Sequence, residues 1–189
     1  KKIVCLVLGF VLTTCAYSAT IKWGSAGPSA VAPSVPELGA WQDCTAFLFA
    51  GTELATMQNA VTDVLNQMQT EGWTAPTTGP GVNGAVVSTN LDTSGRIVIQ
   101  TSELDTTFND GGTYYFYVVI MTEDGKYGIV SSVVEGVMSA EPTPSSPARW
   151  NKDQLVGTSG GWVKIAPEPT ALALLALGVA GVALRRRTR

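Results

Sequence analysis

Thr113 to Thr122 reads TYYFYVVIMT, and this stretch decides the fold class of the chain. Aromatic and β-branched side chains fill almost every position, which is typical of a β-strand. A strand with one solvent-exposed face would alternate apolar and polar residues, and this one does not. We therefore expect a central strand that is buried on both faces.

A second strand is expected directly after it. Glu123 to Lys126 contains Asp124-Gly125, a pair favoured in two-residue hairpin turns. Residues 127–138, YGIVSSVVEGVM, then return antiparallel to the first strand. Thr45–Ala50, TAFLFA, is an apolar and aromatic run of strand length. Shorter strand candidates are Ile21–Trp23, Arg96–Thr101 and Gly161–Ile165.

The apolar period changes between residues 53 and 71, where one helix is expected. Steps of three, four and seven residues separate the apolar side chains, which places them on one helical face: Leu54, Met57, Val61, Val64, Leu65 and Met68. Thr52 is the expected N-cap and Gly72 the expected end. We expect this amphipathic helix to pack on a sheet.

These elements predict a mainly β fold: an antiparallel sandwich-like domain with one amphipathic helix, flanked by an N-terminal signal helix and a C-terminal hydrophobic helix. The β-rich domain is expected at 20–138. A Pro/Ser-rich linker, clearest over Ser139–Ala148, and a final short strand are expected at 139–166, and a tail at 167–189.

The first 18 residues have the pattern of a secretory signal peptide. Lys1 and Lys2 precede an apolar stretch, Ile3–Leu12, that is too short to span a bilayer. Small residues at Ala16 and Ser18 predict cleavage after Ser18, so an export translocon is an expected partner.

Cys15 offers an alternative ending for that signal. Leu12-Thr13-Thr14-Cys15 resembles a lipobox, in which the cysteine is lipidated, although Thr14 replaces the usual Gly, Ala or Ser. Under cleavage after Ser18, Cys44 is the remaining cysteine, and a single thiol forms no internal disulfide. We therefore expect the core alone to hold the domain together.

The charge balance argues against a nucleic-acid partner. Between Thr20 and Ala166 there are 14 acidic residues and 6 basic ones. Such a surface repels a phosphate backbone. The other basic residues lie near the two ends of the sequence.

Candidate catalytic residues are few, since the sequence contains no histidine. Ser-His-Asp and Cys-His sites are thereby excluded, and Cys44 is interpreted as a structural thiol. A hydrolase using two carboxylates is the weaker alternative, with Glu103 and Asp105, or Asp110 and Asp124, as its pairs. Residues 102–112 are read as a solvated loop, and their acidic side chains do not match an EF-hand for Ca²⁺. We expect no enzyme activity, no cofactor and no metal.

Five tryptophans give a second reading of the domain. Exposed aromatic rings on a β scaffold are suited to sugar rings, so a carbohydrate-binding module displayed at the cell surface is the alternative function. The candidates are Trp23, Trp41, Trp73, Trp150 and Trp162. Packing in the core or at sheet edges is the competing interpretation.

The last 24 residues, APEPTALALLALGVAGVALRRRTR, form a distinct segment. The apolar run 171–184 would extend about 21 Å as a helix, short of a hydrocarbon core of about 30 Å. It is apolar all round, unlike an amphipathic core helix. The arginines that follow would stay cytoplasmic under the positive-inside bias. The run therefore predicts a marginal membrane anchor.

Pro167-Glu168-Pro169, the apolar run and the cluster Arg185, Arg186 and Arg187 together resemble the PEP-CTERM sorting signal of Gram-negative bacteria. The resemblance implies that an exosortase recognises Pro167, Glu168 and Pro169 and removes the tail, with the arginines as the cytoplasmic stop. It also implies an association with envelope or extracellular polysaccharide.

We therefore expect an exported, non-enzymatic protein of the cell envelope or extracellular matrix. Its precursor would be anchored in the inner membrane through residues 171–184 before processing.

Overall fold

The computed structural model describes residues 19–28, 31–76, 86–104, 111–138, 147–156 and 161–167. The expected signal peptide with its cleavage residue Ser18, most of the expected linker, and residues 168–189 of the expected tail lie outside the described residues. Within the described part of the chain, no helix is long and apolar enough to cross a membrane.

The larger sheet is built on β5 (Thr113–Thr122), the strand that the sequence placed at its centre. Its neighbours are antiparallel to it, and the order along the main path is β10-β6-β5-β2-β3, with β7 paired to β5 and β9 to β6. The bounds of these strands are Cys44–Gly51 (β2), Val87–Asn90 (β3), Tyr127–Ser131 (β6), Val134–Val137 (β7), Leu155–Val156 (β9) and Val163–Lys164 (β10).

The smaller sheet has the order β4-β1-β8, with β4 at Gln100–Glu103, β1 at Thr20–Ser25 and β8 at Ala148–Trp150. β1 is antiparallel to β4 but parallel to β8. The expectation of an antiparallel fold is therefore correct for the larger sheet and wrong at this one pairing.

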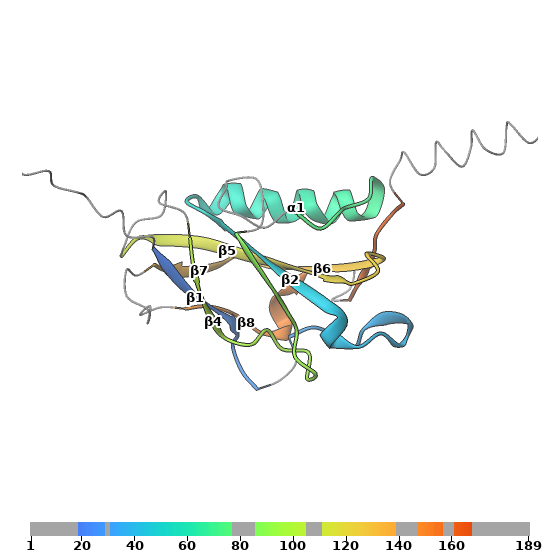
Figure 1. Cartoon of the computed structure of the whole chain (residues 1–189). Helices are drawn as coiled ribbons and strands as arrows, with labels where there is room; N and C mark the ends of the chain where they lie inside the picture. The colour runs from blue at the N-terminus through green and yellow to red at the C-terminus, as the bar shows by residue number, and fades with distance from the viewer. Residues whose placement is uncertain are drawn as a thin grey trace, which may run out of the picture.

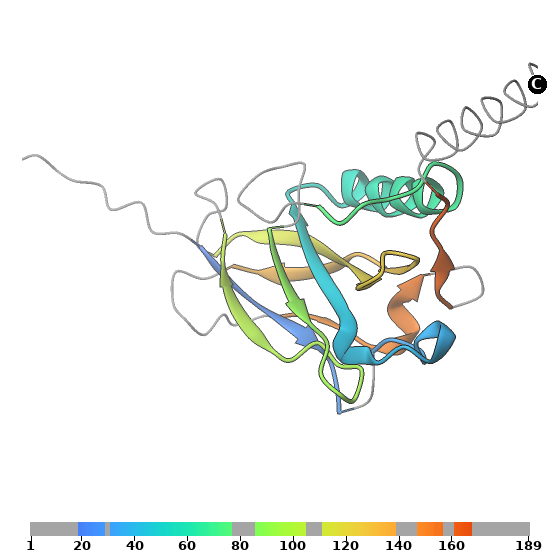
Figure 2. The ribbon, with the colours of Figure 1, turned by 45° about the vertical axis from the view of Figure 1, so that its right-hand side comes forward.

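The larger sheet lies between the smaller sheet and helix α1 (Leu54–Thr70), as Figures 1 and 2 show. Single 3-10 turns lie at Pro36–Leu38, Trp41–Asp43 and Lys152–Gln154. One core cluster fills the space between the sheets and a second lies between the larger sheet and α1. The molecule is thus mainly β, with two sheets and one α-helix in the described residues.

Strand β5 contributes to both clusters because successive side chains point to opposite faces. Phe116, Val118 and Ile120 face the smaller sheet, whereas Tyr117 and Val119 face α1. This confirms the expectation of a strand buried on both faces.

The return from β5 is interrupted by a bulge. Val119 is opposite Val130 and Phe116 is opposite Val134, so two residues of β5 face three residues of the returning chain. The extra residue divides the expected strand 127–138 into β6 and β7. At the bulge, the Ser131 hydroxyl accepts a hydrogen bond from the Val118 backbone N–H at 2.8 Å.

Helix α1 matches the expected range, but its N-cap does not. Glu53, not Thr52, occupies the N-cap position, in an extended conformation. The C-terminal expectation is confirmed, because Gly72 follows the helix with φ of 84°, a conformation that glycine adopts without steric cost.

Two expectations about strand position are wrong. The expected strand Arg96–Thr101 is shifted to Gln100–Glu103, so Ser102 belongs to a strand and is buried rather than part of a solvated loop. Ala148, expected at the end of the linker, is fully buried in β8. Strands beyond residue 138 therefore complete both sheets. Long-range pairing decided these positions, and local composition does not encode it.

Candidate functional site

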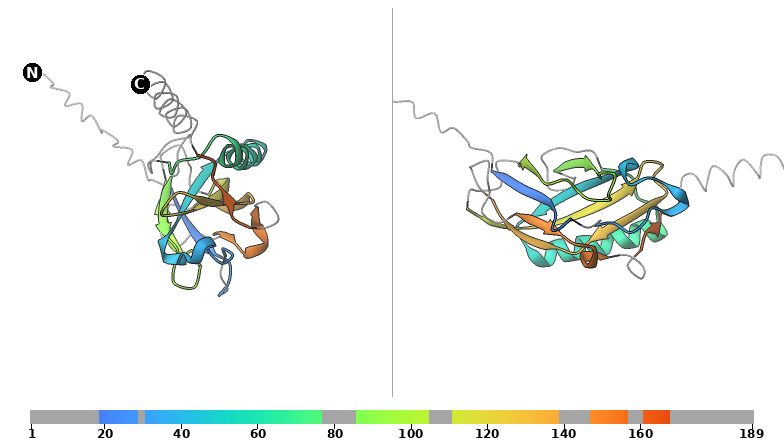
Figure 3. Two further views of the ribbon diagram at one scale, coloured as in Figure 1. Left: turned by 90° about the vertical axis from the view of Figure 1, so that its right-hand side faces the viewer. Right: turned by 90° about the horizontal axis from the view of Figure 1, so that it is seen from below.

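The end of the described chain is tied to the fold by two backbone hydrogen bonds. The Ile165 N–H donates to the Lys126 carbonyl at 2.8 Å, and the Ala166 N–H donates to the Met68 carbonyl at 2.7 Å. Figures 2 and 3 show this segment running from β10 to the C-terminal end of α1. The chain is therefore bonded to the rest of the fold at the two residues directly before the Pro-Glu-Pro sequence.

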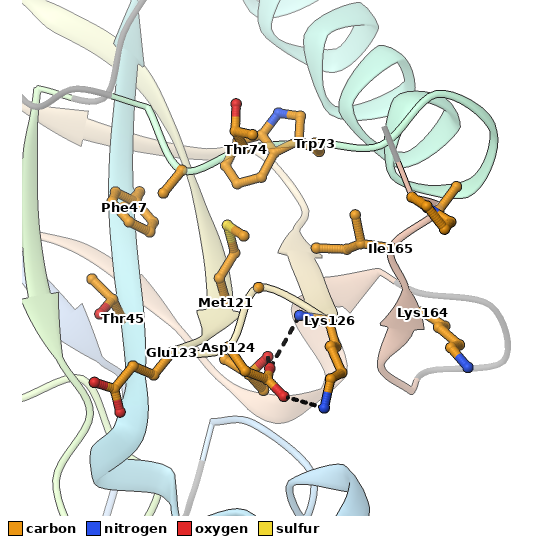
Figure 4. Close-up of a pocket in the computed structure, with 15 residues that line it drawn as sticks. Thr45, Phe47, Trp73, Thr74, Met121, Glu123, Asp124, Lys126, Lys164 and Ile165 are labelled. Atoms are coloured by element: carbon orange, nitrogen blue, oxygen red, sulfur yellow. Dashed lines mark hydrogen bonds and ion pairs between the residues drawn. The ribbon is translucent and has the colours of Figure 1, made fainter. Parts of the chain in front are cut away.

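A pocket of about 660 Å³ opens beside that segment. Its apolar wall consists of Phe47, Trp73, Met121 and Ile165, as Figure 4 shows. Trp73 meets the Phe47 ring edge to face, with centroids 6.4 Å apart and an interplanar angle of 76°. Pro167 also lines this pocket. An apolar wall combined with polar groups is a common form of binding site.

Polar groups at the pocket come from the turn between β5 and β6. Asp124 accepts hydrogen bonds from the Thr122 hydroxyl at 2.7 Å and the Lys126 backbone N–H at 3.1 Å. The Lys126 ammonium lies 3.0 Å from the second carboxylate oxygen of Asp124. These bonds, the one from Thr122 foremost, lower the pKa of Asp124 to about 2.

This turn also differs from the expected two-residue hairpin. Strand β5 ends at Thr122 and β6 begins at Tyr127, so four residues connect them. The Gly125 N–H donates to the Thr122 carbonyl, and Gly125 has φ of 69°. Asp124-Gly125 is still at the centre of the connection, so the expected antiparallel hairpin is confirmed.

A second pocket of about 320 Å³ lies on the other side of the same turn. There the Tyr127 hydroxyl donates to the Glu37 carboxylate at 2.6 Å. This hydrogen bond, with the nearby carboxylate charge, raises the pKa of Tyr127. Glu37 also lies 3.8 Å from the Lys126 ammonium. Glu37 thus contacts two residues of this hairpin, Lys126 and Tyr127.

The tryptophans have different roles. Trp23 and Trp150 are fully buried, and their indole N–H groups donate to the Ser102 hydroxyl and the Ser132 carbonyl. The indole N–H groups of Trp41 and Trp162 both donate to the Pro33 carbonyl. Trp73 is half-buried and lines the pocket of 660 Å³.

The candidate catalytic residues do not form a pair in the described residues. Asp105 and Asp110 lie outside them, Glu103 is exposed on β4 and Asp124 is in the turn. Cys44 is buried, and burial, with the charges of Asp43 and Asp124, raises its pKa to about 11. A neutral, buried thiol is a poor nucleophile. No group of three His, Cys, Asp or Glu side chains in the described part of the chain is arranged to hold a metal.

Sequence reasoning missed the pocket. The sequence does not distinguish Trp73 from the other four tryptophans. Gly72, which follows α1, is the one local sign that the chain changes direction there. The contact of Met68 with Ala166 joins residues 98 positions apart, and no local pattern encodes it.

Comparison with known families matches residues 166–187 to the PEP-CTERM protein-sorting motif. This confirms the resemblance seen in the sequence, and the chain carries that motif. No curated protein and no solved structure matches the chain. The motif implies an exported protein, a precursor anchored in the membrane at its C-terminal end, and an exosortase as the processing partner.

Proposed function

We propose that this chain is a non-enzymatic protein of the cell envelope or extracellular matrix, which an exosortase releases from the membrane. The observation that carries the proposal is the boundary between fold and motif. The motif match begins at residue 166, which is also the residue whose N–H closes the fold onto Met68. Removal of the chain beyond Pro169 would leave every described strand in place.

The non-enzymatic part of the proposal rests on side-chain chemistry. The sequence has no histidine, which is the most frequent general base. Cys44 is buried next to Asp43, whose negative charge disfavours the thiolate. The lack of histidine and the buried state of Cys44 are the two observations that support a non-enzymatic domain.

Processing can be tested with the full chain in a host that has an exosortase. The variant Pro167→Ala/Glu168→Ala/Pro169→Ala should accumulate as a membrane-bound precursor, while the unaltered chain gives a shortened product. Glu135→Ala, which removes an exposed carboxylate from β7, is the matched control. Intact mass of the isolated product is the measurement. A product that retains Arg185–Arg189 in the unaltered chain would contradict the proposal.

Carbohydrate binding by the mature domain is the second candidate, and one observation favours it. Trp73 and Phe47 form an aromatic wall, and the carboxylates of Glu123 and Asp124 lie at the same pocket. Aromatic faces suit the apolar faces of sugars, and carboxylates accept hydrogen bonds from hydroxyl groups. The chain ending at Ala166 should then bind a polysaccharide from a glycan array, and Trp73→Ala should lose this binding. Equal binding of the polysaccharide by this chain and by its Trp73→Ala variant would contradict carbohydrate binding at the pocket.

A further inference from the structure

The sorting motif and the pocket lined by Trp73 are parts of one surface. Ala166 and Pro167, the first two residues of the motif match, line the pocket together with Trp73 and Thr74. Trp73 and Thr74 are more than 90 positions before Ala166 in the sequence, and the fold brings the two segments together. A protein that binds Pro167 must therefore approach within contact distance of the pocket.

The short distance to the membrane strengthens this constraint. Four residues lie between Ala166 and Ala171, where the apolar run starts, so five peptide steps join the two. An extended chain of that length spans about 18 Å at most. The pocket face of the domain is therefore held near the membrane surface in the precursor. The processing enzyme acts in the same narrow space.

The chain before Pro167 is not available as an extended peptide. The backbone N–H groups of Ile165 and Ala166 are already bonded to Lys126 and Met68. The side chain of Ile165 forms part of the apolar wall beside Gly128. An enzyme that needs contacts on this side of Pro-Glu-Pro meets folded surface rather than free backbone.

We propose that the exosortase, when it binds the Pro-Glu-Pro sequence at Pro167, also contacts the pocket face around Trp73 and Thr74. The inference rests on the proposed function, since it assumes processing at this motif. It assigns the occupant of the pocket in the precursor: an apolar element of the enzyme that packs against Trp73.

The experiment measures the rate of conversion of precursor to product for the full chain in an exosortase-bearing host. Trp73→Ala removes the aromatic wall and should slow conversion about tenfold, as expected when a packed aromatic anchor is lost. Thr74→Arg adds bulk at an exposed residue of the pocket and should slow it as well. Because an arginine is attracted to anionic lipid, Thr74→Arg would not weaken contact of the domain with the membrane. Slower conversion would therefore report a contact with the enzyme.

Thr93→Arg is the matched control, because Thr93 is an exposed threonine that does not line this pocket. This chain should be processed at the unaltered rate. A third chain carries six Gly and Ser residues between Ala166 and Pro167, which moves the motif away from the pocket. Conversion of this chain should be slow, and adding Trp73→Ala to it should not lower the rate further.

Unaltered rates for Thr74→Arg, or for the spacer chain, would overturn the inference. So would an equal effect of Trp73→Ala with and without the spacer. Circular dichroism and thermal unfolding identify any variant that fails to fold, and Thr74→Arg then decides in place of Trp73→Ala. Processing of the Pro167→Ala/Glu168→Ala/Pro169→Ala chain would instead show that the proposed function has failed.

Discussion

The Ala166 N–H donates to the Met68 carbonyl at 2.7 Å and thereby joins the end of the domain to the last turn of α1. Carbonyls in the last turn of a helix lack intrahelical partners. Here a distant segment of the chain supplies the donor. The bond is made by the first residue of the match to the sorting motif.

Met68→Ala should destabilise the domain by about 2–5 kcal/mol, because Met68 is fully buried between α1 and β6. Met68→Leu, which nearly conserves the volume, should cost less than about 1.5 kcal/mol. Urea unfolding measures both. Met68→Ala keeps the carbonyl that accepts from Ala166, so hydrogen exchange at the Ala166 amide should accelerate only through the loss of stability. Equal stability of the Met68→Ala and Met68→Leu chains would contradict the prediction.

Gly24→Ala tests a close backbone approach in β1. Gly24 has φ of 150°, and a Cβ there would lie 2.8 Å from the Ile99 Cα, an atom that cannot rotate away. We expect a loss of about 1–3 kcal/mol, the usual range for overpacking. Gly27→Ala is the control, since a Cβ at Gly27 meets nothing within 4 Å. Equal melting temperatures for the two variants would contradict the prediction.

Ser131→Ala tests the hydrogen bond at the bulge. The substitution leaves the buried Val118 N–H without its partner at 2.8 Å, which should cost about 1–3 kcal/mol. Ser94→Ala removes an exposed hydroxyl from a turn and should be close to neutral. Chemical denaturation of both chains separates the two cases. A loss of the same size at both positions would argue against a specific role for Ser131.

Cys44 should make the stability depend on pH in the alkaline range. Burial raises the pKa of its thiol from 9.0 to about 11 in the folded state. The unfolded chain releases this proton first, so the contribution of Cys44 to stability is complete below pH 9 and is lost as the pH rises toward about 11. Cys44→Ala should flatten part of this slope. An identical slope in both chains, measured by urea unfolding, would contradict the assignment.

The same pKa shift predicts low reactivity of the thiol. At pH 8 the thiolate fraction in the folded state should be about a hundredfold below that of the unfolded chain. Iodoacetamide should therefore label Cys44 much faster in urea than in buffer. Comparable labelling rates would show that the thiol is accessible and ionised.

The elements with strong local signals were predictable. The composition of TYYFYVVIMT predicted a strand without a solvent-exposed face. The spacing of the apolar residues from Leu54 to Met68 defined one face of a helix. Weak signals failed where pairing decided the outcome. Arg96–Thr101 has strand-like composition, but β1 pairs with Gln100–Glu103, so the strand is shifted toward Glu103. Ala148 and Trp150 follow a Pro/Ser-rich segment, but pairing with β1 buries both in the core.

By itself the sequence determined the mainly β class, the position of α1, the lack of histidine chemistry and the sorting motif, because each depends on residues that are neighbours along the chain. Only the tertiary structure decided the bulge at Ser131, the parallel strand β8 and the pocket of Trp73 beside Pro167. These features arise from contacts between residues distant in sequence, whose partners are set by the packing of the whole domain.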